Sequence, residues 1–189
     1  MPGAAAFGGK IYLIGGDTED DGPTNKVHVY DPDPDSWSSD LTPMLTPRGF
    51  LRVTRLGGWL YAIGGVNKAG QFLKKVERYK PGSDIWEPVA PMGTRRGGPG
   101  VVTANQRIYV VGGGIGEFGP NSDASKTSEV FAEHAWHPLD VLLPVGRSSL
   151  HAERASGNRI LAIGGFEAPA GPGSTVPSRR VHALNIWEA

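Results

Sequence analysis

The chain contains no cysteine, which excludes disulfide bonds, thiolate metal sites and thiol catalysis. It also has no charge excess, because 19 Lys and Arg residues balance 19 Asp and Glu residues. It therefore offers no electrostatic argument for binding nucleic acid or an anionic membrane. No apolar stretch approaches the roughly 20 residues that cross a bilayer, and residues 1–7 lack the basic start and long apolar region of a signal peptide. We therefore expect a cytoplasmic protein with neither a nucleic-acid partner nor a membrane partner.

A repeat of about 50 residues dominates the sequence instead. Four double glycines each end a short apolar run, and their second members lie 49, 48 and 52 residues apart. Four tryptophans keep nearly the same spacing, at 49, 50 and 51 residues. The residues concerned are Gly15-Gly16, Gly64-Gly65, Gly112-Gly113 and Gly164-Gly165, and Trp37, Trp86, Trp136 and Trp187. Because the repeat shows no helical periodicity, this spacing predicts radially repeated four-stranded sheets.

Each repeat predicts a similar series of strands. The run before the glycine pair is apolar on both faces, which is typical of a strand buried on both sides. A shorter run precedes it across a tight turn, an alternating run follows it, and a last strand begins at the tryptophan. The three runs cover residues 10–14, 59–63, 107–111 and 159–163; residues 50–54, 100–104 and 150–155; and residues 27–30, 76–79, 128–131 and 181–184.

Together these residues resemble the kelch repeat, in which a strand ending in Gly-Gly is followed by a Val-x-x-Tyr segment, a tryptophan and a Pro-Met segment. The first two repeats match best, since Tyr30 and Tyr79 each precede a tryptophan by seven residues. The later repeats depart, with Phe131 and Leu184 in place of the tyrosine. The resemblance implies an all-β kelch-type β-propeller segment over residues 1–189, with about four blades of four antiparallel strands. Its repeats cover approximately residues 1–40, 41–89, 90–143 and 144–189.

Kelch propellers usually close with more blades than these, so we expect an incomplete ring. An open arc leaves two terminal sheet faces without a neighbouring blade. Three interpretations stay open: a piece of a longer chain, a small closed ring of four blades, or self-association that completes a ring.

The resemblance also implies a non-catalytic scaffold that binds a protein or peptide through the loops on one propeller face. Arg48, Arg96 and Arg147 precede the first glycine of their pairs by 16, 16 and 17 residues, so they occupy equivalent positions at that face. An exposed ring of guanidinium groups would favour an acidic peptide. The alternative is that each arginine pairs with an acidic neighbour inside the scaffold. Phe72, in a variable loop, is a further candidate for an exposed binding residue.

An enzyme related to the kelch-fold sialic-acid epimerases is the alternative function. Ser149, His151 and Glu153 alternate along the expected first strand of the fourth repeat, where they could face a central channel. Without a nucleophile elbow, these residues favour a channel lining over a catalytic centre. We therefore predict no catalytic residues, no metal site and no cofactor.

Overall fold

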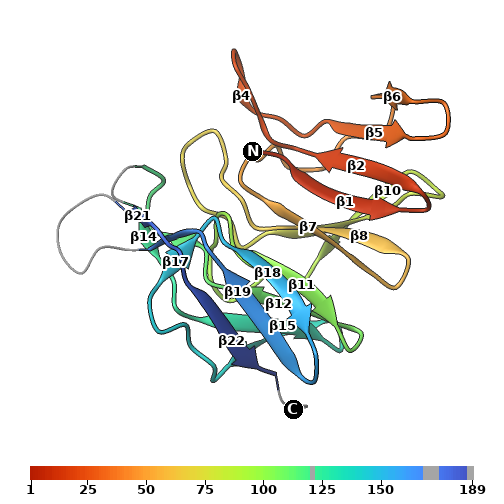
Figure 1. Ribbon diagram of the computed structural model, residues 1–189. Helices are drawn as coiled ribbons and strands as arrows, with labels where there is room; N and C mark the ends of the chain where they lie inside the picture. Colours follow the sequence, from red (N-terminus) through yellow and green to blue (C-terminus); the bar gives the residue numbers. More distant parts are fainter. Residues whose placement is uncertain (120–121, 168–174, 187–189) are drawn as a thin grey trace.

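The computed structural model describes residues 1–119, 122–167 and 175–186 of the chain (Figure 1). All regular elements in this part are β-strands, which confirms the expected all-β fold. Within the same ranges, no helix is long and apolar enough to cross a membrane.

Four antiparallel sheets follow one another along the chain, and we call them blades 1 to 4. Blade 1 contains β1 (Gly3–Phe7), β2 (Lys10–Ile14), β5 (Val27–Asp31) and β6 (Ser36–Ser38). Blade 2 contains β7 (Arg52–Leu56), β8 (Trp59–Ile63), β9 (Val76–Lys80) and β10 (Ile85–Val89). Blade 3 contains β11 (Gly100–Ala104), β12 (Arg107–Val111), β15 (Ser128–Ala132) and β16 (Ala135–Leu139). Blade 4 contains β18 (His151–Ala155), β19 (Arg159–Ile163) and β22 (Val181–Asn185).

The strand predictions agree closely with this order. All four doubly apolar runs form strands with the expected bounds, namely β2, β8, β12 and β19. The run expected at residues 50–54 begins two residues later, at Arg52, because Phe50 has a φ of 53° and belongs to the turn before β7. Trp187, the tryptophan of the fourth repeat, lies outside the described residues.

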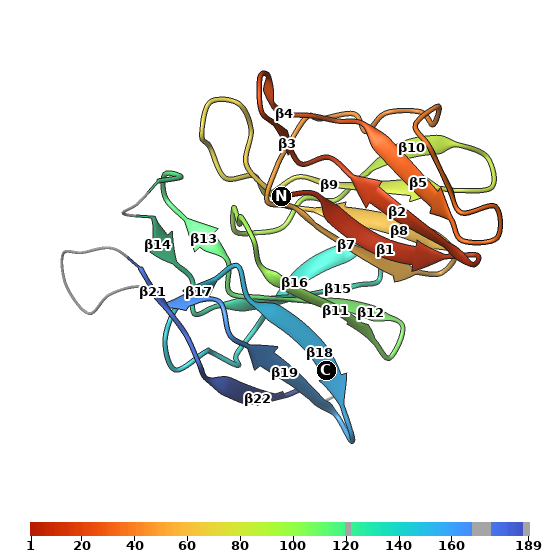
Figure 2. The ribbon, with the colours of Figure 1, turned by 45° about the horizontal axis from the view of Figure 1, so that its top comes forward.

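The first strands of the four blades lie side by side. β1 contacts β7, β7 contacts β11, and β11 contacts β18. Figure 2 shows these strands in that order through the middle of the molecule. This arrangement places blade faces against one another, as in a propeller.

Apolar side chains fill each space between consecutive blades. Tyr12 and Ile14 of blade 1 pack with Leu60 and Tyr79 of blade 2. Equivalent clusters join blade 2 to blade 3 and blade 3 to blade 4. None of these clusters, among the described residues, joins blade 4 to blade 1, so the sheets form an open arc.

The exposure of the outer aromatic residues follows from this open arc. Trp86 is 7% exposed and donates a hydrogen bond from Nε1 to the carbonyl oxygen of Thr42, in the segment between blades 1 and 2. Trp37 holds the equivalent place on blade 1, which has no preceding blade, and is 57% exposed. Val181 on the free side of blade 4 is also 57% exposed. Self-association through these two free faces stays a prediction.

Short ribbons connect the second and third strands at one end of the blades, from β4 at the top of Figure 1 to β14 and β21 on its left. They contain β3 (Asp17–Thr18) with β4 (Gly22–Pro23), β13 (Gly114–Ile115) with β14 (Asp123–Ala124), and β20 (Phe166–Glu167) with β21 (Val176–Pro177). β17 (Arg147–Ser148), in the segment before the first strand of blade 4, pairs with β20. We call this end the loop face.

Candidate binding face

Two segments of each blade build the loop face: the segment that enters the first strand and the residues that follow the glycine pair. In blade 2, Gly49 and Val66 exchange backbone hydrogen bonds of 3.0 and 2.8 Å. In blade 3, Gly97 and Gly114 do the same at 3.0 and 2.7 Å. In blade 4, β17 pairs with β20. The entry segments are therefore fixed in place by the loops that vary between blades.

Arg48, Arg96 and Arg147 lie in these entry segments, but all three are 0% exposed. The expectation that they form an exposed ring of guanidinium groups is therefore wrong. The reason is that each side chain turns inward, where several backbone carbonyl groups accept its hydrogen bonds. These three residues therefore offer no exposed guanidinium group to an acidic peptide.

The hydrogen bonds of the three arginines explain their regular spacing. Arg48 donates from Nη1 to the carbonyl oxygens of Gly64, at 2.9 Å, and Lys75, at 2.8 Å. Those two residues are the first glycine of the pair and the residue before the third strand. Arg96 and Arg147 make the equivalent two bonds in blades 3 and 4. Each guanidinium group therefore joins the ends of the second and third strands of its own blade.

An acidic partner accompanies two of these arginines, which agrees in part with the alternative of internal pairing. Glu129 lies 2.9 Å from Arg96 Nη2, and Glu77 lies 3.4 Å from Arg48 Nη2. Burial lowers the pKa of Arg48 to about 10, and the attraction of Glu77 opposes this shift. A pKa of about 10 still leaves Arg48 protonated at neutral pH.

Blade 4 departs from this pattern, because His182 occupies the position of the glutamates. His182 lies opposite Ala162, as Glu77 lies opposite Ala62 in blade 2. Its Nδ1 is 2.9 Å from Arg147 Nη2, so the ring nitrogen must accept this hydrogen bond in its neutral form. Burial first, and then the charges of Arg147 and Arg180, lower the pKa of His182. The buried cation of blade 4 therefore has no carboxylate partner at the equivalent position.

The glycine pairs contact the entry segment of the next blade. The second glycine donates its N–H to the carbonyl oxygen of the following arginine, as from Gly65 to Arg96 at 2.8 Å. A Cβ atom on the first glycine, Gly64, would lie 2.4 Å from the same oxygen, and its φ is 62°. Only glycine combines this left-handed conformation with so close an approach.

Phe72 is 3% exposed, so the expectation that it lies free in its loop is also wrong. Its ring covers the backbone of blade 3 where Gly97 and Gly114 pair. A Cβ atom at Gly97 would lie 2.3 Å from the Phe72 ring, and one at Gly114 would lie 2.8 Å from it. The two glycines therefore make the room in which Phe72 packs.

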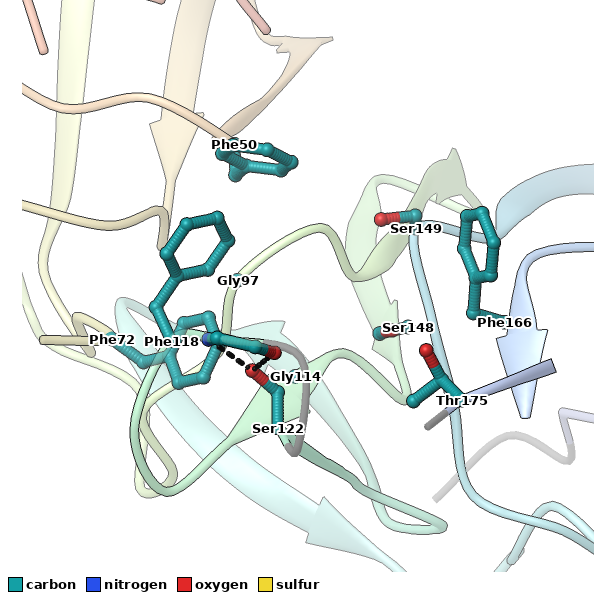
Figure 3. Close-up of a pocket in the computed structure, with 11 residues that line it drawn as sticks. Phe50, Phe72, Gly97, Gly114, Phe118, Ser122, Ser148, Ser149, Phe166 and Thr175 are labelled. Carbon is teal, nitrogen blue, oxygen red and sulfur yellow. Dashed lines mark hydrogen bonds between the residues drawn. The ribbon is translucent and has the colours of Figure 1, made fainter. Parts of the chain in front are cut away.

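Phe72 nevertheless forms one wall of a pocket of about 160 Å³ on the loop face, between blades 2, 3 and 4. Phe118 packs against both Phe50, at 4.9 Å between ring centroids, and Phe72, at 6.0 Å. Figure 3 shows these rings on one side of the pocket and Phe166 across from them. We call this the aromatic pocket; it is lined by Phe50, Phe72, Gly97, Gly114, Phe118, Gly119, Ser122, Ser148, Ser149, Phe166 and Thr175.

The aromatic pocket contains no acidic, basic or histidine side chain among its described lining residues. Its polar groups are hydroxyls. Ser122 Oγ accepts a hydrogen bond from the Gly119 N–H at 2.7 Å, while Ser149 Oγ makes no hydrogen bond within the described ranges. Such a lining can hold an apolar group and offer hydroxyl hydrogen bonds, but it supplies no ionisable group for proton transfer.

Three aromatic residues of this pocket, Phe50, Phe118 and Phe166, were not predicted from the sequence as binding residues. The available signal was one aromatic residue at the start of blade 2, one in the glycine-rich loop of blade 3, and one directly after the last glycine pair. Only the arc of blades shows that these three loops meet.

The structure separates Ser149 from His151 and Glu153, the three residues of blade 4 that resemble a catalytic group in the sequence. Ser149 has a φ of 50° and precedes β18, so it does not alternate with His151 and Glu153 as expected. It lines the aromatic pocket, whereas His151 lines a separate pocket along the first strands. His151 Nε2 and Glu153 Oε2 are 3.6 Å apart, and both side chains are well exposed. The three residues therefore form no single site.

The chain is similar to a known protein family in sequence and to a solved structure in fold. Residues 1–39 and 47–93 match the sequence model described as the kelch motif. No curated protein matches the chain. Among solved structures, the one titled "Structure of YjhT" superposes with a TM-score of 0.76 at 18% identity, over 97% of this chain and 68% of that chain. A likeness at this level of identity shows a shared fold.

Proposed function

We propose that this chain, whose residues 1–39 and 47–93 match the kelch motif, is a non-catalytic binding module for a protein or peptide. An apolar side chain of the partner enters the aromatic pocket on the loop face. The observation that carries this proposal is the lining of that pocket, in which aromatic rings and hydroxyl groups occur without an ionisable side chain.

The size and chemistry of the pocket support one anchoring side chain. A volume of about 160 Å³ is close to the roughly 150 Å³ cavity that holds a benzene molecule. Aromatic residues are enriched at the centres of protein interfaces, where a buried ring can dominate the binding free energy. Phe118 and Phe166 are 46% and 42% exposed, so both have apolar surface that a partner can cover.

The enzyme alternative has weaker support. A general acid or base acts within a site that excludes water and converges on the substrate. His151 and Glu153 are 69% and 60% exposed on the free side of blade 4, and Glu153 is not among the residues that line either of the two pockets. Both side chains are therefore open to water instead of being enclosed around a substrate.

The test begins with a peptide selected from a random displayed library on the immobilised chain. Its affinity is then measured by fluorescence polarisation for Phe118→Ala, Phe166→Ala and a control variant. Full burial of an aromatic side chain contributes about 1.5–3 kcal/mol, so each change in the pocket should weaken binding by about tenfold or more.

The matched control is Ile85→Ala, at a side chain that is 51% exposed. Ile85 lies opposite Lys80, at the end of blade 2 away from the loop face. It should bind the peptide as the unaltered chain does. Unchanged affinity in both phenylalanine variants would refute the proposal, as would selected peptides that need no apolar residue.

A further inference from the structure

A second pocket lies along the first strands of the blades and is separate from the aromatic pocket. It has a volume of about 320 Å³. We call it the axial pocket, because all four first strands contribute to it. Its lining residues are Pro2, Gly3, Ala4, Arg52, Val53, Val101, Leu150, His151 and Ala152.

Arg52 is the one lysine or arginine among the described residues that line the axial pocket. Its Nε donates to the carbonyl oxygen of Pro99 at 3.0 Å, and its Nη2 donates to that of Leu150 at 3.3 Å. These bonds hold the guanidinium group in place between blades 3 and 4. They use two of the five N–H donors of an arginine, and the other three have no acceptor within the described ranges.

No carboxylate in the described part of the chain pairs with Arg52. Three other buried or half-buried arginines of blades 2 and 3 differ in this respect, since Arg48, Arg78 and Arg96 each have a glutamate partner. Burial alone lowers the pKa of Arg52, with no charged neighbour contributing. A partly desolvated cation without a counter-charge interacts strongly with an incoming anion, because little water screens it.

The neighbouring blades leave room beside this cation. The position of Arg52, opposite the last residue of the second strand, is occupied by Gly3 in blade 1 and Gly100 in blade 3. A Cβ atom at Gly3 would lie 2.5 Å from Val53 Cγ2, and one at Gly100 would lie 2.9 Å from Ala152 Cβ. Close approach of the blades therefore keeps these positions free of side chains, and the space next to Arg52 stays open.

We propose that the axial pocket binds a small oxyanion through Arg52, and that a carboxylate is the anion it fits. The guanidinium fork pairs with a carboxylate through two parallel hydrogen bonds. Its Nη1 and Nη2 still have protons for such a pair. A phosphate carries about −1.5 to −2 charges at pH 7, and a single permanent cation leaves part of that charge unbalanced in an apolar pocket.

The probe is acetate, titrated into the isotope-labelled chain at constant ionic strength and followed by the amide signals of Val53, Val101 and Ala152. We expect saturable shifts of these signals, and weaker binding of inorganic phosphate in a parallel titration. Arg52→Met should weaken acetate binding by at least tenfold. The matched control is Arg55→Met, at the one exposed residue of the same strand, which should bind acetate as the unaltered chain does.

A second variant covers the case in which Arg52→Met does not fold. Ala4→Asp keeps Arg52 and places a carboxylate in the same pocket, so added acetate should no longer bind. Undiminished binding by folded Ala4→Asp would overturn the proposal, as would saturable shifts that persist in Arg52→Met or no saturable shift in the unaltered chain. Phe118→Ala should leave acetate binding unchanged, which separates this site from the aromatic pocket.

Discussion

The buried carboxylate of blade 3 gives the sharpest test of how the blades are held together. Glu129 accepts hydrogen bonds from Gly93 N at 2.6 Å, Thr94 N at 3.1 Å, Arg96 Nε at 3.1 Å and Arg96 Nη2 at 2.9 Å. It thereby joins the entry segment of blade 3 to β15. Glu129→Gln keeps the shape of the side chain, removes its charge and leaves Arg96 buried without a counter-charge.

The expected loss is large on the scale of a folded domain. Breaking one side of a buried ion pair costs about 3–5 kcal/mol, whereas a whole domain is stable by about 5–15 kcal/mol. With a urea dependence of about 2 kcal/mol per M, a loss of about 3 kcal/mol lowers the unfolding midpoint by about 1.5 M. The measurement is urea unfolding followed by tryptophan fluorescence and by circular dichroism.

The control is the exposed pair of blade 2, in which Arg78 Nη2 lies 2.6 Å from Glu87 Oε2. The Glu87 side chain is 41% exposed, so Glu87→Gln should cost less than about 1 kcal/mol. Equal, small effects of Glu129→Gln and Glu87→Gln would refute the assignment of the buried arginines to blade stability.

Two further predictions concern the surroundings of Arg147. Gly112→Ala should destabilise the chain by about 2–5 kcal/mol, since its Cβ atom would lie 2.6 Å from the Arg147 carbonyl oxygen, adding overpacking to the left-handed strain. Gly164→Ala, with a φ of 58° and no atom of the described residues nearer than 3.7 Å to the added Cβ, should cost only the strain of about 1–2 kcal/mol. Equal urea midpoints for the two variants would contradict this. Because the pKa of His182 is lowered in the folded chain, the unfolded chain binds the imidazole proton more tightly; the stability due to the neutral ring is therefore present above pH 6.5 and is lost as pH falls below 6.5. His182→Glu should raise the urea midpoint at pH 8 and weaken the loss of stability at pH 5.5. An unchanged loss of stability at pH 5.5 would argue against the Arg147 contact as its cause.

Much of the fold could be predicted because its signals are local and repeated. A run that is apolar on both faces and ends in two glycines predicts the second strand of every blade. The bounds of these strands in the structure are those expected from the sequence. The first strand of blade 2 was less predictable. Phenylalanine is a residue type that strands favour, but the left-handed φ of 53° at Phe50 places this residue in the turn.

The environment of the arginines could not be predicted from their spacing. The sequence shows that Arg48 and its equivalents recur at the same position of each repeat. This regular spacing is expected both for an exposed ring of guanidinium groups and for arginines that pair with acidic residues inside the scaffold. The deciding fact is the position of the carbonyl groups of Gly64 and Lys75, which accept the hydrogen bonds of Arg48. Those groups come together only when the second and third strands pair.

The aromatic pocket was beyond prediction for a similar reason. Phe50, Phe118 and Phe166 belong to three different blades, and each is a single aromatic residue in a variable loop. Their meeting depends on the angle between neighbouring blades. The same holds for Arg52, whose carbonyl partners at Pro99 and Leu150 are 47 and 98 residues away in the sequence.

The central claim, that the loop face binds a partner through the aromatic pocket, is tested most directly by amide hydrogen exchange with and without the selected peptide. Binding in the pocket predicts slower exchange in the segments around Phe50, Phe72 and Phe118, with exchange at β10 unchanged. Protection confined to β10, or to the free faces of blades 1 and 4, would contradict the account.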